Sequence, residues 1–148
     1  MAIDFKIRQA RRGDRAGLAE LLRAHGYPNA ADTNTMLWVF NHPEISLFVA
    51  VDLLERPVGY VCLSLRPQLR LCGRIATIDE FIIDAGWLNR GVPEALLDAA
   101  LKRAKDMDSK RIEVTSHEES PIGADFWARH GFARIASEVL GYACGEAR

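Results

Sequence analysis

The stretch with the clearest chemical potential is residues 82–97, where an apolar run leads into a loop containing Gly86 and Gly91 and then into a helical pattern. A strand, a tight glycine-containing loop and a helix start together direct unpaired backbone N–H groups and the positive end of a helix dipole at one spot. Such a spot binds phosphate or pyrophosphate, and Arg90 adds positive charge to it. The same pattern also fits a plain connection between a strand and a helix.

Two carboxylates, Asp79 and Glu80, stand next to each other shortly before this stretch. In a regular strand, neighbouring side chains point to opposite faces, so only one of the two is expected to face a given cleft. A carboxylate within hydrogen-bond reach of a reacting amine acts as a general base. An ion pair with Arg70, Arg74 or another surface cation is the alternative role for either carboxylate.

The composition excludes several functional classes. A length of 148 residues, with 49% hydrophobic and 26% charged residues, fits one globular domain over 1–148 that has its own apolar core. A net charge of -1 without a polybasic segment argues against a dedicated nucleic-acid or membrane binder. The three cysteines lack metal-ligand spacing, so we expect no metal site and a cytoplasmic protein in a reducing environment.

The periodicity of the chain predicts the elements that position these residues. Apolar runs, alternating or continuous, predict strands over 3–8, 45–51, 57–65, 75–83, 111–116, 132–136 and 138–144. Apolar stripes at helical spacing predict helices over 14–25, 32–41, 92–107 and 121–130. This order predicts a mixed α/β fold, with a mostly antiparallel central sheet flanked by helices and one right-handed strand-helix-strand crossover between residues 75 and 116.

A second segment, Ser120-Pro121-Ile122-Gly123-Ala124-Asp125-Phe126-Trp127-Ala128-Arg129-His130-Gly131-Phe132, follows the first. In this order the two segments resemble the signature motifs of the GNAT superfamily of N-acetyltransferases, which transfer an acyl group from acetyl-CoA to an amine. The resemblance covers the full chain, including the hairpin with Pro57-Val58-Gly59-Tyr60-Val61 and the acidic strand Ile78-Asp79-Glu80-Phe81-Ile82-Ile83. It implies a GNAT-like sheet in a single domain and acetyl-CoA as co-substrate.

The resemblance also implies which residues bind the coenzyme. Main-chain groups of the acidic strand would hold the pantetheine arm, the loop and helix start would hold the pyrophosphate, and the second segment would complete the site. The implied residues are Phe81, Ile82 and Ile83 of the strand, Asn89, Arg90, Gly91, Val92 and Glu94 of the loop and helix start, and Ser120, Phe126 and Trp127 of the second segment. Leu88 and Pro93 depart from the family pattern of Gln or Arg, two residues, Gly, one residue, then Gly or Ala. Pro93 removes one backbone donor, although proline suits the first turn of a helix.

For catalysis, the resemblance implies Asp79 or Glu80 as the general base and a proton donor for the CoA thiolate. The family commonly uses a Tyr as that donor, where this chain has Trp127. An indole N–H donates a hydrogen bond but is not a phenol-like acid. Three interpretations remain. In the first, Trp127 only shapes the pocket; in the second, the proton comes from Tyr142, His117 or water; in the third, catalysis has been lost while the fold is kept. The first two combined are favoured, because a CoA thiol is a good leaving group.

The function implied by the resemblance is transfer of the acetyl group to a primary amine of a small molecule, by direct attack in a ternary complex. A peptide or protein amine is the alternative substrate. The alternative function is a non-catalytic acyl-CoA-binding or interaction module on the same fold, since the loop and the Tyr position are altered. We expect no nucleic-acid or membrane partner, and a homodimer as the assembly.

Overall fold

A five-stranded sheet forms the centre of the fold. The computed structural model describes residues 4–31, 33–116 and 120–145, and the chain divides into two compact units at Val114 and Thr115. The first unit holds the sheet, in the order β1-β2-β3-β4-β5. The strands are β1 (Phe5–Gln9), β2 (Ile45–Asp52), β3 (Pro57–Gln68), β4 (Gly73–Ile83) and β5 (Ser109–Val114). Only β4 and β5 pair in parallel, so the predicted mixed, mostly antiparallel sheet is confirmed.

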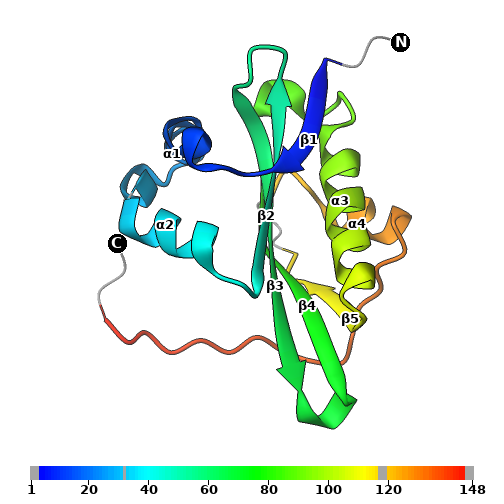
Figure 1. The fold of residues 1–148 in the computed structure, drawn as a ribbon. Coiled ribbons are helices and arrows are strands. Elements are labelled where there is room, and N and C mark those ends of the chain that lie inside the picture. Colours follow the sequence, from blue (N-terminus) through cyan, green and yellow to red (C-terminus); the bar gives the residue numbers. More distant parts are fainter. Residues whose placement is uncertain (1–3, 32, 117–119, 146–148) are drawn as a thin grey trace. The chain divides into compact units, whose positions relative to one another are not determined.

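Three helices cover the two faces of this sheet. Helices α1 (Arg15–Ala24) and α2 (Thr33–Asn41) lie on one face, and α3 (Val92–Asp106) lies on the other (Figure 1). Each helix falls within the range that the periodicity predicts. The predicted crossover is also present, because α3 connects the parallel strands β4 and β5.

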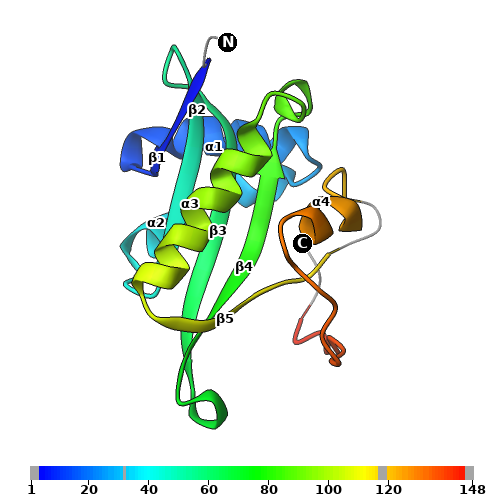
Figure 2. The same cartoon turned by 90° about the vertical axis from the view of Figure 1, so that its right-hand side faces the viewer.

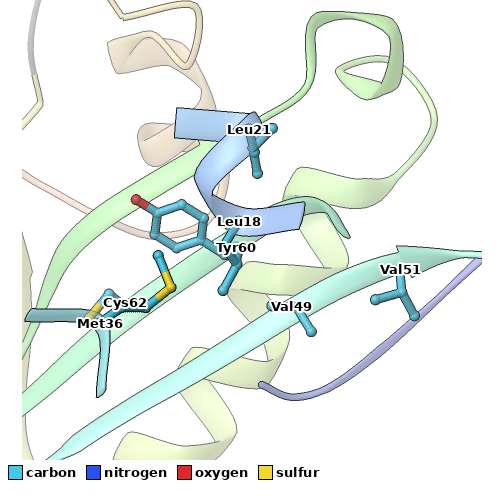
Figure 3. Packing of buried hydrophobic residues seen from close by; sticks show 7 residues of the cluster. All are labelled: Leu18, Leu21, Met36, Val49, Val51, Tyr60 and Cys62. Atoms are coloured by element: carbon cyan, nitrogen blue, oxygen red, sulfur yellow. The ribbon is translucent and has the colours of Figure 1, made fainter. Parts of the chain in front are cut away.

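The face under α1 and α2 carries an apolar cluster that is drawn in Figure 3. Its buried members come from both helices and from β2 and β3: Leu18, Leu21, Met36, Val49, Val51, Tyr60 and Cys62. Burying an aliphatic or aromatic side chain of this size stabilises the fold by about 1.5–3 kcal/mol each. The cluster thereby fixes the side chains of β3 that point toward α1.

On the opposite face, α3 packs closely against β3. Leu96, Leu97 and Ala100 are completely buried. A Cβ atom on Gly59 of β3 would lie 3.2 Å from Leu96 Cδ1, so glycine at this position permits the close contact. Glu94 in the first turn and Arg103 and Lys105 in the last turn match the helix dipole.

The second unit contains helix α4 (Ala124–Arg129) and the chain that follows it. Phe126 and Trp127 are buried, and their rings meet edge to face at 5.1 Å. Phe132 packs on Trp127 at 5.3 Å, and Gly131 has a φ of +87°, a left-handed conformation that ends the helix. The predicted helix over 121–130 is therefore present but shorter.

The strands predicted over 132–136 and 138–144 are wrong. Residues 132–145 contain no strand, and the side chains of Val139, Leu140 and Tyr142 are 81–91% exposed. A strand is stable only when a neighbouring strand satisfies its backbone groups and covers one face. The apolar pattern cannot show whether such a partner exists, and Ala133, Ala136 and Ala143 add little β-propensity.

A buried ion pair joins β1 to the start of α1. Arg8 donates hydrogen bonds from both terminal nitrogens to the two carboxylate oxygens of Asp14, each at 2.8 Å, and the N–H of Arg11 donates to Asp14 Oδ2 at 2.8 Å. Burial by itself would raise the pKa of Asp14, but the hydrogen bonds from Arg8 and Arg11 outweigh it and lower the pKa.

We therefore expect Asp14→Asn to destabilise the fold by about 2 kcal/mol at pH 7, because Arg8 loses its bidentate partner and keeps only the more exposed Glu55. A carboxyl group whose pKa is lower in the native protein stabilises the fold at any pH above its pKa in the unfolded chain, about 3.9. This contribution is lost as the pH falls through the lower pKa of the native state. The difference from wild type should shrink in this acid range. Urea unfolding at pH 7 and near pH 3 measures it, with exposed Asp98→Asn as the control. An equal loss at both pH values would contradict the role of the Asp14 charge.

Candidate functional site

Strand β4 loses one of its two neighbours part-way along its length. Its parallel register with β5 runs from Arg74 to Ile78 and ends there, whereas its pairing with β3 continues to Ile83. Figure 2 shows β5 lying beside β4 at one end only. Within the first unit, residues 79–83 therefore present an edge without a partner strand, and an extended ligand that carries amides can pair with such an edge.

The three residues predicted to bind pantetheine, Phe81, Ile82 and Ile83, lie on this segment of β4. The carbonyl oxygen of Ile83 lies 2.9 Å from His25 Nε2, and the other ring nitrogen of His25 lies 2.9 Å from the carbonyl oxygen of Leu21. His25 thus links the end of α1 to the end of β4. The Ile83 carbonyl therefore already has a partner inside the first unit.

A β-bulge sets the direction of the two carboxylates. Glu80 pairs with Cys62 and Ile78 pairs with the next residue of β3, Leu63, so Asp79 is the extra residue of the bulge. In a bulge two residues of one strand oppose a single residue of the other. Asp79 and Glu80 are both exposed. The expectation that only one of them faces a given side assumed a regular strand, and the bulge means that this assumption does not hold here.

Tyr60 of β3 holds the Glu80 carboxylate. Its hydroxyl donates a hydrogen bond to Glu80 Oε1 at 2.6 Å, while its ring is 4% exposed. Burial, the charge of Glu80 and this hydrogen bond raise the pKa of Tyr60 far above its ordinary value, so the phenol remains a donor. Burial and the charges of Glu80 and Asp79 likewise raise the pKa of the Cys62 thiol to about 12.

The alternative role of these carboxylates, pairing with surface cations, finds no support in the described residues. Arg74 lies 3.9 Å from Glu44 and donates a hydrogen bond to the carbonyl of Met107. Within residues 4–31, 33–116 and 120–145, neither Asp79 nor Glu80 takes part in an ion pair with Lys or Arg. Their charges are therefore available to a molecule that approaches from solvent.

The loop between β4 and α3 has the geometry expected of an anion cradle. Asp84 Oδ1 accepts a hydrogen bond from the N–H of Gly86 at 2.8 Å, which shapes a short 3₁₀ turn over Ala85–Trp87. Gly91 then has a φ of +85° and occupies the N-cap of α3, with no side chain capping the helix. The N–H groups of Val92 and Glu94 in the first turn consequently have no acceptor inside the helix.

Arg90 in this loop is held in place from two sides. Its guanidinium stacks on the Trp87 ring at 3.8 Å from the centroid and forms an ion pair with Asp4. Trp87 in turn meets Phe5 of β1 edge to face at 6.4 Å. Arg90 is thus close to the start of α3, as predicted, but an incoming phosphate has to compete with Asp4 for it.

Two features of the first turn of α3 weaken the cradle. Pro93 supplies no N–H there. Glu94 brings a carboxylate into the same turn, and its Oε2 is buried without a hydrogen-bond partner. Asn89, the remaining predicted loop residue, is exposed.

The other predicted residues belong to the second unit. Ser120 Oγ accepts a hydrogen bond from the N–H of Ile122 at 3.1 Å, so this hydroxyl shapes the approach to α4. Phe126 and Trp127 are buried on α4, and Tyr142 is 91% exposed. His117, named above as another proton donor, lies outside the described residues.

One site residue, Tyr60, was not predicted. It lies in an apolar run of β3, where a tyrosine fits an ordinary core position. Its contact with Glu80 depends on the register of β3 against β4, which no local pattern reveals. The sequence indicated only that the strand of Tyr60 and the acidic strand of Glu80 belong to the same sheet.

Two further properties hold for the described part of the chain. No group of three or more His, Cys, Asp or Glu side chains in it is arranged to hold a metal ion. None of its helices is both long and apolar enough to cross a membrane.

One family model matches most of the chain. Residues 16–132 match the model of the acetyltransferase (GNAT) family. The chain is 26% identical over 137 residues to an amino-acid acetyltransferase of Mycobacterium tuberculosis (strain ATCC 25618 / H37Rv), a match that covers 87% of this chain and 68% of the relative.

Solved structures share the fold. A transcriptional regulator from Bacillus halodurans C-125 superposes with a TM-score of 0.81 at 22% identity, over 94% of this chain and 99% of the other. AAC(6')-Iy, in complex with the bisubstrate analogue CoA-S-monomethyl-acetylneamine, superposes with a TM-score of 0.75 at 16% identity, over 94% and 97% of the two chains.

The surroundings of Cys62 lead to a test of thiol reactivity. Its pKa of about 12 keeps the buried thiol protonated at pH 8, whereas Cys72 and Cys144 are exposed. A disulfide reagent that releases a coloured thiolate should titrate two thiols in the native protein and three after unfolding. In the Cys62→Ala variant, only the thiol that becomes reactive on unfolding should be missing. Rapid reaction of all three thiols in the native protein would contradict this environment.

Proposed function

The chain belongs to the acetyltransferase (GNAT) family, and we propose that it transfers the acetyl group of acetyl-CoA to a primary amine of a small molecule, by direct attack in a ternary complex. The observation that carries the proposal is the juxtaposition on β4. Its edge without a partner strand begins at Asp79, next to the Glu80 carboxylate held by Tyr60.

The residues present fit a CoA thioester, which supplies the acetyl group in activated form. Residues 79–83 offer main-chain groups to the amides of the pantetheine arm. The first turn of α3, with the N–H groups of Val92 and Glu94, offers donors to the pyrophosphate, and Arg90 and Asn89 lie in the same loop. Ser120, Phe126 and Trp127 of the second unit stay proposed coenzyme-binding residues.

Glu80 is proposed as the general base. Its Oε1 accepts the Tyr60 hydrogen bond, which leaves Oε2 to take a proton from the acceptor amine, directly or through water. As the proton leaves, the nitrogen forms a bond to the acetyl carbonyl carbon, and the carbon–sulfur bond then breaks. The sulfur takes a proton from Tyr142 or from water, since the indole of Trp127 is not an acid. Asp79 adds a second negative charge next to the incoming amine.

The state of Cys62 supports direct attack over a covalent acyl-enzyme. Cys62 shares the bulge with Glu80, but its thiol is buried and its pKa is raised to about 12. A thiol must ionise to act as a nucleophile at useful rates. Burial and the two neighbouring carboxylates instead keep the Cys62 thiol protonated.

A small acceptor is favoured by the name of the mycobacterial relative, an amino-acid acetyltransferase. A peptide or protein amine is the alternative substrate. Cytoplasmic location and a homodimer, which the sequence predicts, stay predictions.

The activity is tested by thiol release from acetyl-CoA over a panel of small amines and short peptides. Loss of the general base in Glu80→Gln should lower kcat about 100-fold or more, with little change in the KM for acetyl-CoA. Asp79→Asn should have a smaller effect, because Asp79 lacks the fixed contact with Tyr60. Acetyl-CoA binding without turnover of any amine would instead favour the non-catalytic module.

The loop assignment is tested with two glycines of similar conformation. Gly91 and Gly26 have φ values of +85° and +88°, so valine is strained at either position. Both variants should have a lower Tm than wild type. A saturating ligand stabilises the native state by about 2.7 kcal/mol at 100 times its Kd, so acetyl-CoA should raise the Tm of wild type and of Gly26→Val. The increase should be absent in Gly91→Val, and an unchanged increase there would argue against this loop.

A further inference from the structure

We propose that Tyr60 is a positioning residue for the general base: its hydroxyl fixes Glu80 so that Oε2 faces the acceptor amine. The inference rests on the proposed function, because it assigns a role within that reaction. It starts from the 2.6 Å hydrogen bond between Tyr60 Oη and Glu80 Oε1. This length is typical of a strong hydrogen bond from a hydroxyl to an ionised carboxylate.

The register of the sheet brings these two side chains together. Tyr60 pairs with Ile82 and Glu80 pairs with Cys62, so Tyr60 and Glu80 are diagonal neighbours on one face of adjacent strands. Diagonal neighbours are within reach of an aromatic side chain. The bulge at Asp79 interrupts the regular ladder directly next to Glu80, and the Glu80 side chain is exposed there.

The Tyr60 ring is held much more firmly than the carboxylate that it contacts. It packs in the apolar cluster with Leu18, Leu21 and Cys62, and its hydroxyl points out of the cluster, away from Val49 and Val51 (Figure 3). An exposed glutamate by itself samples several rotamers, at a cost in entropy when it must adopt one. A hydrogen bond from a ring in the core supplies the restraint that an exposed position lacks.

The protonation of Tyr60 makes this restraint permanent. Its pKa is raised far above the ordinary phenol value by burial and by Glu80. The charged and titratable groups around the pair are Asp79 of β4, Cys62 of β3, and Tyr27 and His25 near the end of α1. None of them competes for the Tyr60 hydrogen bond, because the hydroxyl donates to Glu80 alone among the described residues. Tyr60 therefore acts through Glu80 and not as an acid itself.

A double-mutant cycle of Tyr60→Phe, Glu80→Gln and both together separates positioning from packing. Phenylalanine keeps the buried ring and removes the donor. Tyr60→Phe should lower kcat about tenfold with the KM for acetyl-CoA unchanged, since the carboxylate loses the hydrogen bond that fixes its orientation. In the Glu80→Gln background the same change should have no further effect on kcat.

Two other variants keep the test informative. Glu80→Asp shortens the acidic side chain and breaks the contact from the other side, so it should lose kcat to a similar extent and be insensitive to Tyr60→Phe. Tyr27→Phe, which removes a hydroxyl from an exposed neighbour, is the matched control and should match wild type. Urea unfolding and the acetyl-CoA-dependent Tm increase verify that each variant is folded.

The outcomes distinguish this inference from the function on which it rests. Suppose that wild type turns over an amine. If Tyr60→Phe then lowers kcat equally in the wild-type and Glu80→Gln backgrounds, or does not lower it at all, the positioning role is overturned and the acetyltransferase proposal stays intact. Acetyl-CoA binding without turnover of any amine by wild type would overturn the proposed function itself, and the role of Tyr60 with it.

Discussion

The site depends on one interruption of the sheet, at the point where β4 passes Ile78. On one side the pairing with β5 ends, and on the other side the bulge at Asp79 breaks the regular ladder with β3. The first change leaves a strand edge that can bind an extended ligand, and the second turns the carboxylates of Asp79 and Glu80 toward solvent beside that edge. A β4 that paired with β5 along its whole length and with β3 in regular register would provide neither feature.

The rest of the first unit stabilises this irregular segment. The cluster under α1 and α2 fixes the Tyr60 ring, His25 links α1 to the carbonyl of Ile83, and α3 packs on β3 at Gly59. The buried pair of Arg8 and Asp14 joins β1 to the same helix. The strand edge at residues 79–83 and the exposed carboxylates thus lie next to a well-packed core, as is common for sites that must hold a fixed geometry.

Much of this fold could be predicted from the sequence because its signals are local. The leucine and alanine stripe gave the position of α3, and Gly91 with Arg90 marked the loop before it. The bulge and the contact of Tyr60 with Glu80 could not be predicted, because both depend on register between strands. The strands expected after residue 131 failed for a related reason: an apolar pattern does not say whether a partner strand is available.

Hydrogen–deuterium exchange of the wild-type protein with and without acetyl-CoA tests the central claim most directly. If the edge of β4 beyond Ile78 binds the coenzyme, acetyl-CoA should slow exchange over residues 79–83 and in the first turn of α3. Residues 74–78, which are already paired on both sides, should change little. Saturating acetyl-CoA that leaves exchange over 79–83 unchanged would contradict the account.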